Sequence, residues 1–146
     1  MKRIFIIFLA LVMTSITTRV FADNEYPITF EQLPVLAQTF VKNHFPSAQI
    51  SYCIKESRGY EVRFADATEI EFTKTGAWKD VDCKYSTVPE SILKLIPASI
   101  PTYIKSVLPS TVITQVKIDG RRYELKLNTG LELEFNRSGA IIRMDD

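Results

Sequence analysis

The sequence is poor in the residue types on which most enzyme active sites depend. Its 146 residues include one histidine, two cysteines and five glycines. No G-x-S-x-G, H-E-x-x-H or glycine-rich phosphate-binding motif occurs. His44 precedes Phe45 and Pro46, a typical position for a polar residue in the last turn of a helix. The alternative, a nucleophilic pair of His44 and Cys53, lacks a third residue to orient the histidine. We therefore expect no enzyme activity, no catalytic residue and no cofactor.

The first 22 residues are typical of a cleaved export signal. Lys2 and Arg3 precede the apolar run Ile4–Val12, and Val20–Ala22 supplies the small residues that a signal peptidase requires. A membrane anchor is the alternative, but the apolar run is shorter than the roughly 18 to 20 residues that span a bilayer. We predict cleavage between Ala22 and Asp23, a periplasmic or secreted location, and no membrane anchor in the mature chain.

The chain also lacks an excess of either charge. It holds 18 basic and 17 acidic residues, and three of the basic ones (Lys2, Arg3 and Arg19) lie in the predicted signal. The mature chain thus has 15 basic residues against 17 acidic ones, a net charge of −2. This balance excludes nucleic acid as an expected partner, because a basic surface is needed to displace the counterions of phosphates. It equally disfavours electrostatic attachment to a membrane.

What the chain does contain is an internal similarity. A shift of 63 residues aligns Leu33–Cys83 with Ile96–Asp146 without a gap and gives 15 identities in 51 positions. We therefore predict an α+β fold of two tandem repeats, residues 23–84 and 85–146, in one compact domain. Each repeat is expected to contain a helix, or a helix pair, and its own four-stranded antiparallel sheet.

The helices are expected at the start of each repeat. Residues 34–46 and 97–109 begin and end with proline and carry apolar residues at helical spacing. Pro101 should make the second helix start late or kink. Short helices are expected before both: Thr29–Gln32 has the pattern of a capping box, and Val88–Leu95 is amphipathic.

The strands show strict alternation of apolar and charged residues, which predicts one buried and one solvated sheet face. The alternating segments are Tyr60–Phe64, Glu69–Phe72, Tyr123–Leu127 and Leu131–Phe135. Asp119-Gly120 and Asn128-Thr129-Gly130 are turn signals. Pairing the apolar faces places Phe64 near Ile70 and Val62 near Phe72. The same register sets Arg63 opposite Glu71, and Lys126 opposite Glu134.

The charged positions of these strands form the candidate binding site. Acidic residues can form a calcium site or a pair of glycosidase carboxylates, but these are explained as the solvated face of a sheet with cross-strand ion pairs. We predict no metal site. The candidate residues for binding a partner are Glu61, Arg63, Glu69, Glu71, Glu124, Lys126, Glu132 and Glu134. Trp78, whose equivalent is Ile141, is expected to pack in the core.

Cys53 and Cys83 could form a disulfide in an exported protein. Cys53 falls in the first strand of its repeat and Cys83 after the fourth. In a simple meander those strands are about 14 Å apart, whereas a disulfide needs Cα atoms within about 7 Å. We favour two free thiols. A disulfide remains the alternative, because the strand order is itself inferred.

The recurring motifs resemble a known family. A proline-started helix that ends in Phe-Pro or Leu-Pro is followed by Tyr-Glu-Val or Tyr-Glu-Leu, then Glu-Ile-Glu-Phe or Glu-Leu-Glu-Phe, then Gly-Ala. This pattern is similar to that of the PepSY-like, β-lactamase-inhibitor-like periplasmic proteins of Bacteroidetes, over essentially the whole mature chain. The resemblance implies helix-plus-sheet repeats with a partly concave surface that binds and regulates another protein, such as a peptidase. No inhibitory contact residue can be assigned from the motifs.

We accordingly expect an exported, non-enzymatic protein-binding module, an inhibitor or regulator of another exported protein. The alternative is a sensor of a small ligand or peptide that uses a groove between the two sheets, near Tyr85–Pro89. A pocket lined by apolar groups would favour the ligand, and a flat charged face would favour the protein partner.

Overall fold

The structure, a computed structural model of the chain, describes residues 20–22 and 24–146. The predicted signal segment and the cleavage at Asp23 therefore lie largely outside the described residues. The strands are β1 (Tyr26–Ile28), β2 (Ile50–Glu56), β3 (Gly59–Phe64), β4 (Glu69–Thr73), β5 (Trp78–Asp82), β6 (Ile113–Asp119), β7 (Arg122–Leu127), β8 (Glu132–Asn136) and β9 (Ile141–Asp145). The helices are η1 (Phe30–Gln32), α1 (Val35–His44), α2 (Glu90–Leu93) and α3 (Ser99–Val107).

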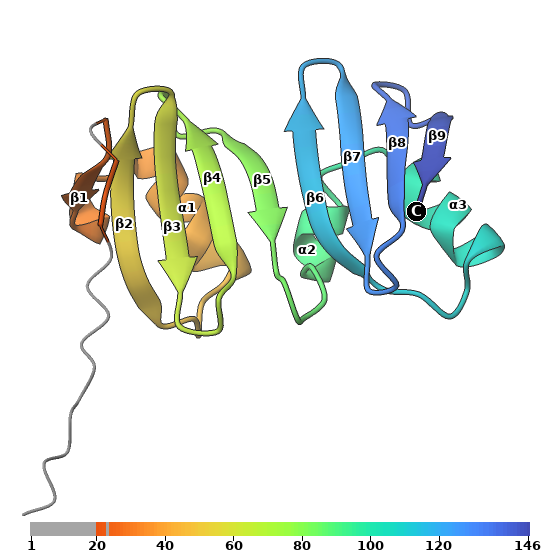
Figure 1. Cartoon of the computed structure of the whole chain (residues 1–146), viewed down its shortest axis with the longest axis horizontal. Coiled ribbons are helices and arrows are strands. Elements are labelled where there is room, and N and C mark those ends of the chain that lie inside the picture. The colour runs from red at the N-terminus through yellow and green to blue at the C-terminus, as the bar shows by residue number, and fades with distance from the viewer. Residues whose placement is uncertain (1–19, 23) are drawn as a thin grey trace, which may run out of the picture.

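All nine strands form one antiparallel sheet in the order β1 to β9 (Figure 1). The prediction of two tandem units, each with its own four-stranded sheet, is therefore wrong. β5 pairs with β6, with Asp80 opposite Lys117 and Val81 opposite Val116. Both valines are completely buried. An unpaired β5 would leave a row of backbone N–H and C=O groups open at the edge of a sheet, and β6 satisfies them.

The helices cover only one face of the sheet. Figure 1 shows α1 behind the strands of the first half and α2 and α3 behind those of the second. The core lies between these two layers. The ring of Phe40 on α1 meets Phe72 on β4 edge-to-face, with 5.7 Å between centroids. Tyr103 on α3 meets Phe135 on β8 in the same way, also at 5.7 Å. Offset and edge-to-face contacts of this kind fix the position of a helix over a sheet.

The helices begin and end close to where the sequence predicts. α1 has Pro34 as its N-terminal cap and ends one residue before Phe45. α3 starts at Ser99, two residues after Pro97, so Pro101 falls in the first turn, where its missing N–H costs no hydrogen bond. The predicted short helices are η1 and α2. The backbone N–H of Thr29 donates to Oε1 of Gln32 (2.9 Å), which is one half of the predicted capping box. Within the described ranges, no helix has the length and apolar character needed to cross a bilayer.

The predicted strand register is wrong by two residues. Arg63 lies opposite Glu69 and Glu61 opposite Glu71. The same holds in the second half, where Lys126 lies opposite Glu132. The cause is the length of the hairpin loops between β3 and β4 and between β7 and β8. Each loop has three residues between the two residues whose hydrogen bond closes it, and the third has positive φ, which pulls the strands into the tighter pairing.

Backbone hydrogen bonds define these two loops. The N–H of Phe64 donates to Thr68 O (2.9 Å) around Ala67, whose φ is 72°. The N–H of Leu127 donates to Leu131 O (2.9 Å) around Gly130, whose φ is 90°. The sequence predicts the second turn through its glycine but hides the first, because alanine seldom adopts positive φ.

Two glycines hold the helices against hairpin turns. Gly139, between β8 and β9, has a φ of +86°, and a Cβ there would lie 2.1 Å from Ser99 Oγ and 2.8 Å from Pro97 Cβ. The Ser99 hydroxyl donates to the carbonyl of Gly139 (3.1 Å), which ties α3 to this turn. Gly76 has the same role against Pro34 at the start of α1, with a φ of +89°.

We predict that Gly139→Ala lowers the free energy of unfolding by about 2 to 4 kcal/mol, because positive φ and a steric clash with α3 act together. Gly120→Ala is the matched control. Gly120 has a φ of +58° but no heavy atom within 4 Å of the added Cβ, so we expect a loss of about 1 kcal/mol. Urea denaturation of both variants measures the difference. Equal losses would show that contact with α3 contributes nothing.

Candidate functional site

The face of the sheet without helices carries two continuous rows of polar side chains; we call it the outer face. Alternation along each strand places these residues opposite the buried ones. In the first row, cross-strand neighbours are Glu61, Glu71, Asp80, Lys117, Glu124, Glu134 and Arg143. In the second row they are Arg63, Glu69, Asp82, Gln115, Lys126, Glu132 and Asp145.

All eight predicted site residues lie in these two rows. The prediction treats them as two separate groups, on β3 and β4 and on β7 and β8. The structure joins the groups through β5 and β6, which the prediction left out. The residues missed are Asp80, Asp82, Gln115, Lys117, Arg143 and Asp145. The sequence contains the pattern that indicates them on β5, because Asp80 and Asp82 flank the buried Val81 in the same alternation of charged and apolar residues.

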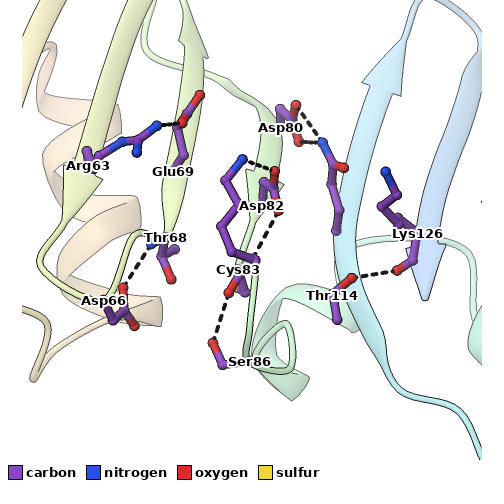
Figure 2. A network of polar contacts seen from close by, with 12 residues as sticks. Arg63, Asp66, Thr68, Glu69, Asp80, Asp82, Cys83, Ser86, Thr114 and Lys126 are labelled. Atoms are coloured by element: carbon purple, nitrogen blue, oxygen red, sulfur yellow. Dashed lines mark hydrogen bonds and ion pairs between the residues drawn. The ribbon is translucent and has the colours of Figure 1, made fainter. Parts of the chain in front are cut away.

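Ion pairs within the rows hold the side chains in place. Arg63 forms an ion pair with Glu69, as Figure 2 shows. Lys126 Nζ lies 3.0 Å from Glu132 Oε1, and Lys117 Nζ lies 3.7 Å from Glu124 Oε2. Exposed pairs of this kind contribute only about 0 to 1 kcal/mol each to stability. Their effect is to give the face a fixed pattern of charge.

The register also places like charges opposite each other. Glu61 faces Glu71, and Glu124 faces Glu134. Each of the buried glutamates has a compensating partner: the hydroxyl of Tyr52 donates to Glu61 (3.3 Å), and Arg122 forms an ion pair with Glu134.

Glu134 has a second cationic partner, and Glu71 also has one. Arg143 Nη2 lies 3.4 Å from Glu134 Oε2, and Lys79 Nζ lies 3.2 Å from Glu71 Oε2. The like-charged neighbours are thus tolerated because arginine, lysine and tyrosine groups surround them.

Asp80 is the third residue of the first row and lies at the junction of β5 and β6. Nε2 of Gln115 donates to both carboxylate oxygens of Asp80, at 3.0 and 3.1 Å. Burial raises the pKa of Asp80 from its ordinary value of 3.8 to about 6. The hydrogen bond from Gln115 and the charge of Lys117 oppose this rise, whereas Glu71 and Asp82 add to it.

The second half of the outer face is slightly hollow. A concavity of about 260 Å³ lies over β6 to β9. Its lining is almost entirely charged or polar, and comes from both rows: Gln115, Lys117, Glu124, Lys126, Glu132, Glu134, Arg143 and Asp145, with Leu125 and Leu133 beneath. A lining of this kind is unlike the apolar pockets that enclose most small ligands. A second concavity of about 400 Å³ lies at the other end of the sheet, beside Tyr26 and Tyr60.

The two cysteines are both free and both buried. Cys53 lies on β2 and Cys83 directly after β5, with β3 and β4 between them in the sheet. This separation bears out the preference for unpaired thiols. Burial raises the pKa of each thiol to about 11, so both stay protonated at neutral pH, the opposite of what a nucleophile requires.

His44 joins two helices. Its Nδ1 lies 2.7 Å from the Ser91 hydroxyl on α2, and its ring lies against Phe40, with 4.5 Å between centroids. Burial lowers the pKa of His44. The structure thus brings His44 to a serine rather than to Cys53. The contact links α1 to α2 across the two halves of the chain. Among the described residues, no group of three or more His, Cys, Asp or Glu is arranged to hold a metal ion.

The fold is therefore an antiparallel sheet with helices on one face and a polar outer face. Comparisons with known proteins show the family to which it belongs. A family model described as "Putative beta-lactamase-inhibitor-like, PepSY-like" matches residues 20–63 and 58–143. The chain belongs to this PepSY-like family. No curated protein gives a significant match.

Solved structures from Bacteroides share the fold over almost their whole length. One, described as a "putative periplasmic protein" of a domain-of-unknown-function family from Bacteroides vulgatus, is 35% identical, covers 86% of this chain and 99% of its own, and has a TM-score of 0.79. Another, from Bacteroides thetaiotaomicron and described as a "putative calcium-regulated periplasmic protein", is also 35% identical, covers 84% and 97%, and has a TM-score of 0.78.

A third solved structure, described as a "putative periplasmic protein of unknown function" from Bacteroides vulgatus, is 29% identical, covers 84% of this chain and 99% of its own, and has a TM-score of 0.77. These relatives confirm the predicted location of the chain in the periplasm. Nothing in the family, in these relatives or in the described residues indicates catalysis.

The pKa of Asp80 leads to a prediction about stability and pH. Because folding raises this pKa, the carboxyl contributes stability below pH 3.8 that is lost as the pH rises through 6, up to roughly 3 kcal/mol. Asp80→Asn removes the charge and keeps an acceptor for Gln115. We expect the variant to be more stable than the original by about 1 to 3 kcal/mol at pH 7.5 and by much less at pH 4.5.

Urea denaturation at both pH values measures this difference. Asp119→Asn, at the exposed end of β6, is the control for the removal of a carboxylate away from the junction of β5 and β6. A gain for Asp80→Asn that is the same at pH 4.5 and pH 7.5 would contradict the assignment of the titration to Asp80.

Proposed function

We propose that this protein is a non-enzymatic binding module that recognises another exported protein through the outer face of its sheet. The observation that carries the proposal is the continuity of this face. Two rows of charged and polar side chains cross seven strands, and the helices all lie on the opposite side. A partner would thus meet one rigid surface.

The size of the outer face suits a protein partner. Strands lie about 4.8 Å apart and rise about 3.3 Å per residue, so nine strands of about five residues cover roughly 38 by 17 Å, or about 650 Å². A standard interface buries about 800 Å² on each partner. The shallow hollow over β6 to β9 supplies some curvature for a complementary surface.

The charges of the face are suited to specific recognition. Arg122, Arg143 and Glu132 have side chains 58 to 65% exposed, and Lys117 and Lys126 have 45% exposed. These groups are held by ion pairs yet remain accessible, so a partner with the complementary pattern loses little conformational entropy on binding. Complementary charges would speed association and exclude wrong partners more than they would raise affinity.

An inhibitor or regulator of a periplasmic enzyme, such as a peptidase, is the form of this function that we favour. The family's description as β-lactamase-inhibitor-like supports it. The relative described as calcium-regulated suggests that calcium should be a variable in any binding experiment. A sensor that uses a groove between two sheets has lost its proposed site, because the two halves share one sheet, and neither concavity described above includes a residue of segment 85–89.

The test begins with capture. The exported protein is used as bait in a periplasmic extract, with calcium and with a chelator, and bound proteins are identified by mass spectrometry. The affinity of the purified partner is then measured for two variants. Lys117→Glu/Lys126→Glu reverses two charges on the outer face. Lys94→Glu/Lys105→Glu makes the same change at exposed positions on the helical side.

We expect the outer-face variant to bind at least about tenfold more weakly, because two complementary contacts become repulsive, and the helical-side variant to bind normally. All four lysines are at the surface, so both variants should fold, which circular dichroism checks. Equal binding by the two variants, or a folded bait that captures no protein, would rule out the outer face as the binding site.

A further inference from the structure

The last strand, β9, is an edge strand with unusual exposure of apolar side chains. All five residues from Ile141 to Asp145 are exposed. Ile141 is 38% exposed, Ile142 48% and Met144 39%. An edge strand also presents unpaired backbone N–H and C=O groups, which readily pair with another strand.

The opposite edge is protected. β1 has only three residues, and the central one is Pro27, which has no N–H to donate. The sheet therefore has one blocked edge and one open edge.

Within the same chain, the strand that corresponds to β9 is β5, and β5 is not an edge strand. β5 begins and ends 63 residues before β9, so Val81 corresponds to Met144 and Asp82 to Asp145. β5 is covered by the antiparallel strand β6, which leaves Val81 fully buried, whereas Met144 is 39% exposed. The N–H of Cys83 donates to the carbonyl of Thr114 on β6 (2.8 Å). Because alternate residues of a strand point their backbone groups the same way, Val81 also faces β6.

We propose that the open edge pairs with β9 of a second copy of this chain, antiparallel and centred on Met144. In this register Met144 lies opposite its counterpart on the side of the sheet that holds the helices. Arg143 of each copy lies opposite Asp145 of the other, on the outer face. The pairing is self-complementary, as a two-fold interface requires.

The neighbouring registers are worse for electrostatic reasons. A pair centred on Arg143 sets two arginines opposite each other, and one centred on Asp145 sets two aspartates opposite each other; both arrangements are destabilising. A pair centred on Ile142 sets Ile141 against Arg143. The register centred on Met144 alone matches opposite charges twice and places an apolar pair at the axis.

The consequence for the molecule is a wider outer face. A two-fold axis perpendicular to the sheet keeps both helical layers on one side, so the two nine-stranded sheets join and their outer faces become continuous. The interface uses the edge of the sheet and leaves most of the outer face open. Arg143 and Asp145 belong both to this interface and to the outer face, so their variants are judged by dimerisation and not by partner binding.

Cross-linking tests the register directly. Met144→Cys places one thiol from each copy at the axis, and mild oxidation should give a covalent dimer in high yield. Ser57→Cys, in the exposed turn between β2 and β3, is the control and should remain largely monomeric. The two native cysteines are buried and free, so they contribute little background. The experiment uses protein exported to and purified from the periplasm.

Analytical ultracentrifugation over a range of concentrations then tests the charge pairing. We expect a monomer–dimer equilibrium for the original protein and roughly a tenfold rise in its dissociation constant for Asp145→Arg, which sets arginine against arginine twice. The double variant Arg143→Asp/Asp145→Arg restores opposite charges and should recover dimerisation.

Three results would each overturn the proposal. The first is a protein that stays monomeric at every concentration. The second is a dimer that Asp145→Arg leaves unchanged, since another surface would then form it. The third is cross-linking of Met144→Cys to a different protein in place of its own copy, which would make the edge a site for a foreign strand.

Discussion

The pairing of β5 with β6 is the interaction on which the rest of this structure depends. It spans only three residue pairs, yet it converts two halves of the chain into one sheet. The buried contact between Val81 and Val116 removes apolar surface from water, and the backbone groups of β5 gain partners at the same time. Without this junction the molecule would have two short sheets, and each would expose an additional open edge.

The same junction determines the electrostatics of the outer face. Asp80 is drawn into a partly buried position beside Glu71 and Asp82, which is unfavourable for a carboxylate and raises its pKa to about 6. Gln115, from the other side of the junction, donates to both of its oxygens. Burial of this carboxylate costs stability at neutral pH, and the hydrogen bonds from Gln115 reduce that cost while they link β5 to β6.

Much of the fold could be predicted from sequence, because strands and helices have local causes. The alternation in Tyr60–Phe64 and the prolines at 34 and 46 are sufficient to place β3 and α1. The register of the first hairpin could not be predicted, since it depends on the positive φ of Ala67, which an alanine seldom adopts. The register of the second hairpin was also predicted wrongly, although Gly130 indicates its turn. The candidate site was found residue by residue on β3, β4, β7 and β8. Its continuity was missed, because the residues that connect the two groups lie on β5 and β6.

The sequence by itself determined the positions of β3, β4, β7 and β8, the separation of apolar from charged side chains, and the membership of the family, because all three follow from the order of residues over short distances. Only the tertiary structure decided that the two halves share one sheet and that the cysteines stay apart. It also decided that the residue opposite Glu71 is Glu61 and not Arg63. These outcomes depend on the pairing of strand edges, and the free energy of that pairing comes from residues far apart in the chain, such as Val81 and Val116.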